Sequence, residues 1–356
     1  MNPVFLAGRG LASSLGPSLG AAVDALRQGG PSPEIRTLTG GFAWPFHAIA
    51  DDSDKGDWWP WVRRVITRVA ADSGALTTDR RGPLFLASSS LDIGGREQDG
   101  GFEHGMRRLA DEIAGWLNWT GPVITVSTAC TSASNALLTA AALIRRGDAC
   151  DSLVLGVELP NRLTLAGFGS MQLLSPTAAR PLGAGRDGLV LGEAVAALHL
   201  SRHPSRWRVA GGANVVDGTD PAGAVQHAVV EMCWRALSNS GLHPQDIDLI
   251  KLQAAGSGAN DATEAAALHE VFKPLPPLVS LKANLGHTLG ASGAAEIALL
   301  TACLESEAWP RATPPDRALN AVLASQAPAH VRNVLATILG FGGGHTAIVL
   351  ENGASS

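Results

Sequence analysis

The sequence predicts an α/β fold made of two similar halves, and three observations support this class. Short runs rich in Val, Leu and Ile alternate with segments of helical pattern, as expected for buried strands joined by helices. The second half of the chain repeats the scheme of the first. Hydrophobic residues make up 46% of the chain and charged residues 17%, with 41 glycines, which is typical of a compact, tightly packed protein with many turns.

The first half is predicted to span residues 1–202. A strand at 4–7 and a helix from Ser18 to about Arg27 open it, and residues 30–56, rich in Pro, Gly and Asp, are expected to form an irregular cap. The remaining expected elements are an amphipathic helix from 57 to about 75, a buried strand at 83–89, a helix around 105–116, and strands at 123–126, 152–158 and 194–200.

The second half is predicted to span residues 203–356, and only a turn near 202–206 separates it from the first. Its expected strands lie at 207–212, 247–252, 278–281, 334–339 and 346–351, and its expected helices at 222–240, 261–272 and 290–305. Alternating strands and helices in both halves indicate a duplicated α/β architecture.

Charge and composition exclude several function classes. The net charge is −5 and no basic run suggests a nucleic-acid surface. The apolar start, residues 1–8, is too short and glycine-interrupted to span a membrane. Four scattered cysteines without paired spacing or a signal peptide fit reduced thiols. We therefore expect a cytoplasmic protein, and no metal or dinucleotide motif is present.

The most informative stretch is the β-rich run at 123–126, which leads through Ser127-Thr128-Ala129 to Cys130 and directly into a helical pattern. Strand, tight turn, nucleophile and helix form the geometry of a nucleophile elbow. The positive end of the helix dipole is expected to favour a thiolate at Cys130. An isolated cysteine is more often a small buried residue, and that interpretation is given to three others: Cys150, Cys233 and Cys303.

Three further motifs follow the elbow in order: Arg186-Asp187-Gly188 with Gly192-Glu193, Lys282 with His287, and Gly340-Phe341-Gly342-Gly343. Together the four resemble the β-ketoacyl-acyl-carrier-protein synthases, the type I/II branch of the thiolase-like condensing enzymes. Each motif alone is weak, but four in the right order are specific, and the resemblance runs from Val4 to Leu350. It implies a five-layered αβαβα fold and a homodimer or heterodimer built through the sheet beside the elbow.

The resemblance also implies a chemistry. Cys130 would attack an acyl thioester on the phosphopantetheine arm of an acyl-carrier protein, which is a substrate arm and not a bound cofactor. The main-chain N–H groups of Cys130 and Phe341 would stabilise the oxyanion, and Phe341 would gate the acyl pocket. His287 would donate a hydrogen bond to the malonyl-derived enolate, and Lys282 would tune the site.

The stretch before Asp261 departs from the family pattern. The family's first histidine falls on Gln253 in an ungapped match, or on Ala255 with a two-residue gap; the ungapped match is preferred because the preceding strand then also aligns. The two threonines that grip pantetheine become Ala255 and Ser257. A glutamine amide can donate to an enolate oxygen, but it cannot act as an acid or base.

Other positions carry weaker assignments. Glu264 matches the family's acidic residue after the first histidine loop, and Asp261 to Glu264 is also a plausible helix capping box. The resemblance further implies substrate contacts at Phe168 and Gly342. His345, where the family usually has Asn, is interpreted as structural.

The tryptophan cluster Trp58, Trp59 and Trp61 is interpreted as core or subunit interface. A partner or membrane patch is the alternative for it.

Three functions stay open from the sequence. The chain could be a working condensing enzyme with a Cys-Gln-His site, in a type II fatty-acid or polyketide pathway of the aryl-polyene kind. It could load an acyl group on Cys130 and pass it elsewhere without elongation. It could also be a silent partner, like a chain-length factor, although such subunits usually lose the cysteine. The retained Cys130, Lys282 and His287 favour a ketosynthase-type protein that can be acylated.

Overall fold

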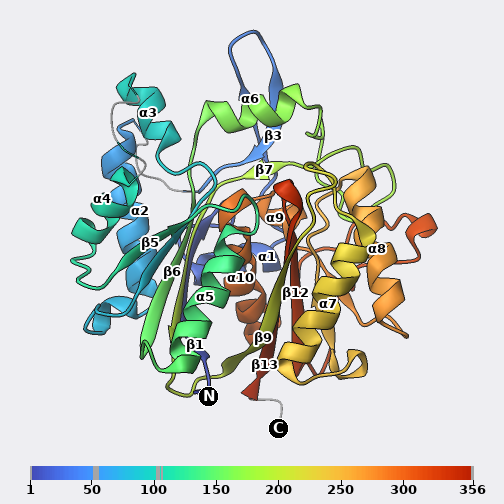
Figure 1. The fold of residues 1–356 in the computed structure, drawn as a ribbon. Helices are drawn as coiled ribbons and strands as arrows, with labels where there is room; N and C mark the ends of the chain where they lie inside the picture. The colour runs from blue at the N-terminus through green and yellow to red at the C-terminus, as the bar shows by residue number, and fades with distance from the viewer. Residues whose placement is uncertain (1, 51–55, 102–104, 106, 354–356) are drawn as a thin grey trace.

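The computed structural model describes residues 2–50, 56–101, 105 and 107–353. Within these residues, ten strands form one sheet in the order β11-β10-β12-β13-β9-β1-β8-β6-β4-β5, shown in Figure 1. Its two halves join where β1 pairs with β9 through Phe5 and Leu6, opposite Arg208 and Trp207. The sheet is therefore two five-stranded units that meet along a short seam.

Both units have the same strand order. The first contains β1 (Phe5–Ser13), β4 (Leu84–Ala87), β5 (Val123–Val126), β6 (Asp151–Glu158) and β8 (Ala194–Ser201). The second contains β9 (Trp207–Val216), β10 (Leu249–Lys251), β11 (Leu278–Val279), β12 (Asn333–Leu339) and β13 (Gly344–Asn352). Numbered along the chain, each unit runs third, second, fourth, fifth, first across the sheet. The duplicated scheme predicted from the sequence is present in the topology, while the boundary at residues 202 and 203 stays a prediction.

Helices build three layers around the two units (Figure 1). The central layer holds α1 (Leu19–Arg27), α5 (Ser132–Arg146) and α10 (Ser292–Ser306), and α5 and α10 each contact strands of both units. The outer layers hold α2 (Trp58–Asp72) and α4 (Arg108–Trp116) on one side, and α7 (Gln226–Ser240) and α8 (Gly258–Val271) on the other. The five-layered αβαβα arrangement is confirmed.

Separate apolar clusters fill the spaces between layers. Val62, Val65 and Val69 of α2 pack on the outer face of the first unit. Ala133 of α5 and Ala294 of α10 belong to the central cluster, where small side chains allow the two helices to lie close together. The site residue Cys130 belongs to a smaller cluster of its own.

The predicted irregular cap at 30–56 contains regular structure, so that prediction was wrong for part of its length. Residues Glu34–Thr37 form β2 and Ala43–His47 form β3, an antiparallel hairpin whose turn holds Gly40 and Gly41 at positive φ. Paired glycines suit a hairpin turn, and β3 also pairs with β7 (Leu191–Gly192). The cap's residues 51–55 lie outside the described residues.

Several predicted helix limits need correction. The helix expected around 105–116 begins at Arg108, and residue 106 of that prediction lies outside the described residues. A short helix, α3 (Ile93–Asp99), was not predicted, because its two glycines disfavour a helix. The helix expected from 222 begins at Gln226. The predicted capping box at Asp261 is absent because Ser257, four residues earlier, caps α8.

The tryptophan cluster and the three cysteines other than Cys130 lie outside the site. Trp58 and Trp61 are buried against the outer face of the first unit, which confirms the core interpretation for these two. Cys233 and Cys303 are buried as predicted, whereas Cys150 is exposed and that prediction was wrong. None of the helices described in the structure is long and apolar enough to cross a membrane.

Candidate active site

Cys130 lies in the turn between β5 and α5 and is only 4% exposed. The preceding residue, Ala129, has a φ of +50°, a left-handed backbone that non-glycine residues adopt at a cost. The Ser132 hydroxyl holds this turn by donating to the carbonyl of Ala129 at 2.6 Å and accepting from the N–H of Thr128 at 2.9 Å. The strand, strained turn and helix predicted as a nucleophile elbow are therefore present.

The expected thiolate at Cys130 is not favoured in the resting structure. Burial raises the pKa of the Cys130 thiol to about 11, against the lowering effects of the Phe341 N–H, the Lys282 charge and the Cys130 N–H. The sequence argument weighed the helix dipole without the desolvation of a buried sulfur, which here is the larger effect. At neutral pH Cys130 is a thiol that must give up its proton to react.

His287 is the group that can take that proton. Its Nε2 lies 3.1 Å from Cys130 Sγ, and its Nδ1 lies 3.1 Å from the Ser292 hydroxyl. Burial, with the positive charges of Lys282 and Lys251, lowers the pKa of His287 well below its usual value. The imidazole is therefore neutral and can accept a proton through one ring nitrogen.

The glycine loop carries Phe341, whose backbone N–H acts on the site cysteine. Burial has the largest effect on the pKa of the Cys130 thiol, and against it the N–H groups of Phe341 and of Cys130 itself lower that pKa. Gly343 has a φ of +72°, and a Cβ there would lie 1.4 Å from the carbonyl oxygen of Asp217. Only glycine fits at this position, which fixes the loop beside Cys130.

The ring of Phe341 stacks on Phe168 of α6 (Arg162–Ser170), with centroids 5.4 Å apart and an interplanar angle of 11°. Phe168 packs against an apolar cluster that includes Cys130 and Ala255. Gly342, between the two glycine-loop residues already described, has a φ of +79°. The residues predicted to contact substrate at 168, 255 and 342 thus lie around the nucleophile.

Lys282 is completely buried and pairs with Glu296 of α10. The other oxygen of Glu296 lies 2.7 Å from the ammonium group of Lys251, which also donates to the carbonyl of Thr337 at 2.7 Å. Burial alone would raise the pKa of Glu296, but the two ammonium groups hold it below its ordinary value. The three side chains form a buried network with one more positive than negative charge.

Sequence reasoning missed Lys251 and Glu296. A signal was present, because each is a single charge inside an apolar segment, a strand in one case and a helix in the other, and such charges are buried only when paired. Their pairing depends on tertiary structure, since they lie 45 residues apart.

Gln253 is buried, and its Oε1 has no hydrogen-bond partner within the described part of the chain. Its backbone is held by Glu264, which accepts from the N–H groups of Gln253 and Ala254 at 2.9 and 2.8 Å. Glu264 also accepts from the Thr337 hydroxyl at 2.6 Å. The acidic residue therefore fixes the loop that carries Gln253, and it leaves the amide oxygen free for a ligand.

Asp261 and Ser257 complete this loop. Asp261 accepts from the N–H groups of Ala255 and Gly256, each at 3.1 Å. The Ser257 hydroxyl accepts from the N–H of Asn260 and caps α8. A hydroxyl that caps a helix can still donate to a ligand, so the predicted pantetheine contact at Ser257 stays a prediction.

Glu158 is a further buried residue near the site to which no role was given from the sequence. Its carboxylate accepts from the N–H groups of Ser89, Ser90 and Gly290, at 3.0 to 3.1 Å, and from both serine hydroxyls. It thereby ties the end of β4 to the turn that follows His287. His345 is buried on β13, and both of its ring nitrogens lack partners among the residues the structure covers.

The remaining motif, 186–193, frames the site from outside. Arg186 pairs with Asp316 at 2.5 Å, and Glu193 pairs with Arg36 at 2.6 Å. The backbone of Gly192 donates to the carbonyl of His287 at 3.0 Å. The described residues contain no cluster of three or more His, Cys, Asp or Glu side chains able to hold a metal ion.

A duplicated five-layered α/β fold with a cysteine at an elbow in one half and a histidine from the other defines the thiolase-like class. Two family models match the sequence and narrow this class to one family. The N-terminal domain of beta-ketoacyl synthases matches residues 98–205 and the C-terminal domain matches residues 207–314, together more than half of the chain. The chain belongs to the beta-ketoacyl synthase family.

Curated relatives agree with this family. The chain is 30% identical over 274 residues to a Streptomyces cyaneus protein named as a polyketide beta-ketoacyl synthase, and 31% identical over 254 residues to the 3-oxoacyl-acyl-carrier-protein synthase 2 of Mycobacterium leprae. The alignments cover 69% and 64% of this chain but only 64% and 60% of those relatives. The chain thus matches less than two thirds of their length.

Solved structures share the whole fold. A ketosynthase in complex with its chain length factor from Xenorhabdus doucetiae matches with a TM-score of 0.85 and 24% identity, covering 99% of this chain and 98% of that one. The ishigamide ketosynthase/chain length factor matches with a TM-score of 0.80 and 24% identity, over 99% of both chains.

Proposed function

We propose that the chain is a ketosynthase-type subunit that forms an acyl thioester on Cys130 and takes part in decarboxylative condensation with a malonyl group on a carrier protein. The observation that carries the proposal is the 3.1 Å contact between Cys130 Sγ and His287 Nε2. The main-chain N–H groups of Phe341 and Cys130, which lower the pKa of the same thiol against the larger effect of burial, support it. A buried structural cysteine needs neither a base nor paired donors.

Acyl transfer begins with the neutral thiol. Cys130 Sγ attacks the thioester carbonyl carbon while its proton passes to Nε2 of His287. The N–H groups of Cys130 and Phe341 hold the oxyanion. When the intermediate collapses, the pantetheine sulfur leaves and takes the proton from His287, so the site ends acylated and neutral.

Condensation needs a second set of donors. Loss of carbon dioxide from the malonyl thioester leaves an enolate, whose carbon attacks the acyl group on Cys130 and expels the cysteine sulfur. His287, as the neutral tautomer with Nε2 protonated and Nδ1 accepting from the Ser292 hydroxyl, would donate to the enolate oxygen together with the amide N–H of Gln253. The net positive charge of Lys251, Lys282 and Glu296 would stabilise the enolate. Because an amide transfers no proton, we expect loading to be more efficient than condensation.

A heterodimeric partner role is the second candidate, and the exposed edge of the sheet favours it. β5 is the last strand in the order, and Ile124 on it is 39% exposed. An uncovered strand of β-branched residues pairs readily with another chain. The structural neighbours from Xenorhabdus doucetiae and the ishigamide system are described as ketosynthases with a chain length factor, and this chain would pair in the same manner, as a homodimer or with a second ketosynthase subunit.

Intact-protein mass spectrometry tests the proposal. The chain is incubated with acyl-carrier protein, alone and with a co-expressed ketosynthase subunit, and malonyl-carrier protein is then added. A condensing enzyme gains the acyl mass, loses it on addition of malonyl-carrier protein, and yields an extended carrier-bound product. Cys130→Ala is the control.

Three outcomes separate the candidates. An adduct that elongates establishes condensation and shows that Gln253 suffices. An adduct that persists without elongation leaves acyl transfer. No adduct in either preparation contradicts acylation and leaves the silent partner, like a chain-length factor.

A further inference from the structure

Lys251 ends β10 and is 1% exposed, and it takes no part in the proton transfer of the proposed acylation. Its ammonium group is held on two sides, 2.7 Å from the Glu296 carboxylate and 2.7 Å from the carbonyl oxygen of Thr337. The other carboxylate oxygen of Glu296 pairs with Lys282. A lysine is rarely buried without a partner, and here two buried lysines share a single carboxylate.

This network lies one helical turn from the residue that holds the imidazole of His287. Ser292 and Glu296 are four residues apart on α10, so their side chains lie on the same face of the helix. The Ser292 hydroxyl contacts His287 Nδ1 at 3.1 Å, and His287 Nε2 contacts Cys130 Sγ at 3.1 Å. Along these contacts the network reaches the imidazole before it reaches the sulfur.

Buried charged side chains approach the thiol–imidazole pair from five elements of the described chain. They are Lys251 on β10, Lys282 in α9 (Lys282–Leu285), Glu296 on α10, Glu158 on β6 and Glu264 on α8. Burial, followed by the charges of Lys282 and Lys251, lowers the pKa of His287. Burial, and to a smaller extent Glu158, raises the pKa of Cys130. Burial lowers the pKa of Lys251, while the carboxylates of Glu296 and Glu264 act against it and favour its charged form.

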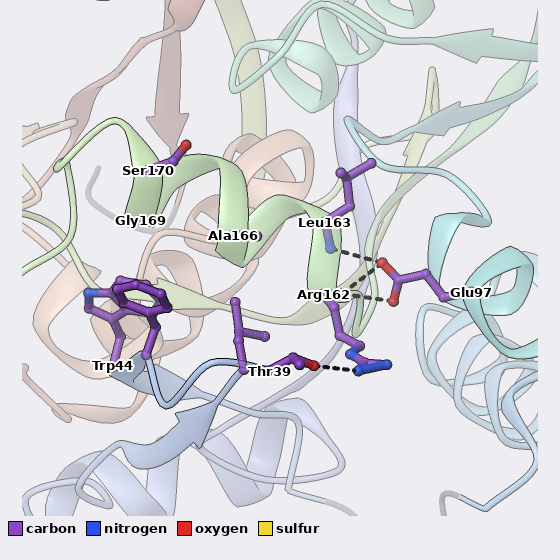
Figure 2. Close-up of a pocket in the computed structure, with 10 residues that line it drawn as sticks. Thr39, Trp44, Glu97, Arg162, Leu163, Ala166, Gly169 and Ser170 are labelled. Atoms are coloured by element: carbon purple, nitrogen blue, oxygen red, sulfur yellow. Dashed lines mark hydrogen bonds between the residues drawn. The ribbon is translucent and has the colours of Figure 1, made fainter.

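Charges on the outer side of α6 act through solvent instead. The Glu97 carboxylate accepts from the backbone N–H groups of Arg162 and Leu163 at 2.8 Å, at the start of that helix (Figure 2). Arg162 is exposed, and its guanidinium donates to the Thr39 hydroxyl at 3.4 Å. Because solvent and salt screen exposed charges much more than buried ones, Arg162 is a suitable positive charge for comparison with Lys251.

We propose that Lys251 is a positioning residue that keeps the resting site as a neutral thiol and a neutral imidazole. A proton that moves from Cys130 Sγ to His287 Nε2 places a third positive charge beside two ammonium groups that share one carboxylate, and like charges disfavour this. The thiolate–imidazolium form therefore stays rare before a thioester enters. Since the thiolate is the reactive form of cysteine, Cys130 is protected from other electrophiles.

Alkylation by iodoacetamide tests this on the full chain without any carrier protein. The Cys130 sulfur displaces iodide and forms a thioether, and the thiol proton passes through His287 to solvent. The rate at pH 7, measured by peptide mapping, is expected to rise roughly tenfold in Lys251→Met, because the imidazolium loses one like charge. The exposed Cys150 is an internal standard whose rate stays the same in every variant.

Two further substitutions separate the charge of Lys251 from its structural contacts. Lys251→Gln keeps a hydrogen-bond donor but removes the charge, and it is expected to be alkylated as fast as Lys251→Met. Lys251→Arg keeps the charge and should restore the wild-type rate. Arg162→Met removes an exposed positive charge and should leave the rate unchanged.

Urea unfolding shows that each variant is folded. Lys251→Met leaves Glu296 paired with Lys282, whereas Glu296→Gln leaves two ammonium groups without a carboxylate. Lys251→Met is therefore expected to unfold at a higher urea concentration than Glu296→Gln.

A double variant and a pH profile show whether Lys251 acts through His287. In His287→Ala the thiol has no imidazole to receive its proton, so adding Lys251→Met should give no further rise in rate. In the wild type the rate should climb steadily with pH towards the Cys130 pKa of about 11. In Lys251→Met the climb should be shallower near neutral pH, because proton transfer inside the pair does not depend on pH.

Three results would overturn the proposal: a rate in Lys251→Met no higher than in the wild type, a rise that Lys251→Gln does not share, or a rise that persists in His287→Ala. The inference rests on the proposed function for the role of Cys130 as the nucleophile. Its test needs no acyl-carrier protein, so a failure of the proposed acylation, seen as a missing acyl adduct, is a separate result.

Discussion

The third strand of each unit ends the sheet, yet the two ends differ. β11 is buried, and the segment after η4 (Arg317–Leu319) covers it: Leu323 bridges Leu278, and the N–H of Ala324 donates to the Leu278 carbonyl at 2.8 Å. β5 has no such cover within the described residues and leaves Ile124 exposed. The same topological position is thus closed in one half and open in the other, and assembly is expected only at the open one.

The helices that follow these strands differ as well. α5 begins just after the nucleophile and keeps exposed positions such as Thr139. α10 follows His287 and is buried at every position from Ser292 to Cys303, including Glu296. The two helices occupy equivalent positions in the duplicated fold, and Cys130 precedes one while His287 precedes the other. Because the two helices pack together, the thiol and the imidazole come into contact.

The largest expected effect is a loss in the free energy of unfolding when the buried network of Lys251, Lys282 and Glu296 is broken. Glu296→Gln leaves the ammonium groups of Lys251 and Lys282 without a carboxylate, and removing one partner of a buried ion pair costs about 3–5 kcal/mol. Urea unfolding measures it. Glu231→Gln, in an exposed pair with Arg235, is the matched control and is expected to cost at most about 1 kcal/mol. Equal losses in both variants would contradict the account of the network.

The next largest expected effect is on assembly, through the uncovered edge strand β5. Ile124→Lys places a charge on β5 and is expected to weaken assembly at least tenfold, because a charged edge strand resists pairing. Sedimentation velocity, with the chain alone and with a co-expressed ketosynthase subunit, measures it. Val322→Lys, 57% exposed beside the covered edge, should leave assembly unchanged. If Val322→Lys dissociates the complex and Ile124→Lys does not, the comparison of the two edges is wrong.

Alkaline pH is expected to lower the free energy of unfolding through the buried thiol of Cys303 but not through the exposed thiol of Cys150. Burial raises the pKa of the Cys303 thiol from 9.0 to about 12, so its contribution to stability is complete below pH 9 and falls as the pH rises towards 12. At pH 10 the loss is roughly 1.4 kcal/mol, since one pKa unit corresponds to about that free energy.

Unfolding free energies at pH 8 and pH 10 measure this loss. Cys303→Ala should have a smaller difference between the two pH values than the wild type by that amount. Cys150→Ala, at an exposed site, is the control and should behave as the wild type. An unchanged difference in Cys303→Ala would count against the burial argument.

The smallest expected effect on stability is at Ser257, where a substitution distinguishes a helix cap from a contact with the ligand. Ser257→Ala removes the hydroxyl that accepts from Asn260 at the start of α8 and is expected to cost about 1 kcal/mol. α5, by contrast, has no side-chain cap. If Ser257 also contacts pantetheine, KM for the carrier substrate rises as well; Ser257→Thr, which keeps a hydroxyl, should restore both readouts. Loss of stability without a change in KM limits Ser257 to the cap.

Sequence predicted most of the fold because the strands and helices of both units have clear periodicity and sit between turn residues. It failed at the β2–β3 hairpin and α3, where glycines hid short regular elements. At the site, motif order brought Cys130, His287 and Phe341 into the prediction. The sequence could flag Lys251 and Glu296 as single charges in apolar segments, but it could not show that they form one network with Lys282, because those contacts depend on how the sheets and helices pack. The thiol pKa was assigned the wrong direction since burial is not readable from local sequence.

Peptide mapping after exposure to an acyl-pantetheine thioester tests the central claim most directly, that the two halves together make Cys130 a nucleophile. The account predicts an acyl group on the buried Cys130, none on the exposed Cys150, and strong loss of labelling in His287→Ala. Acylation of Cys150 in preference to Cys130, or labelling of Cys130 that is unaffected by His287→Ala, would contradict it.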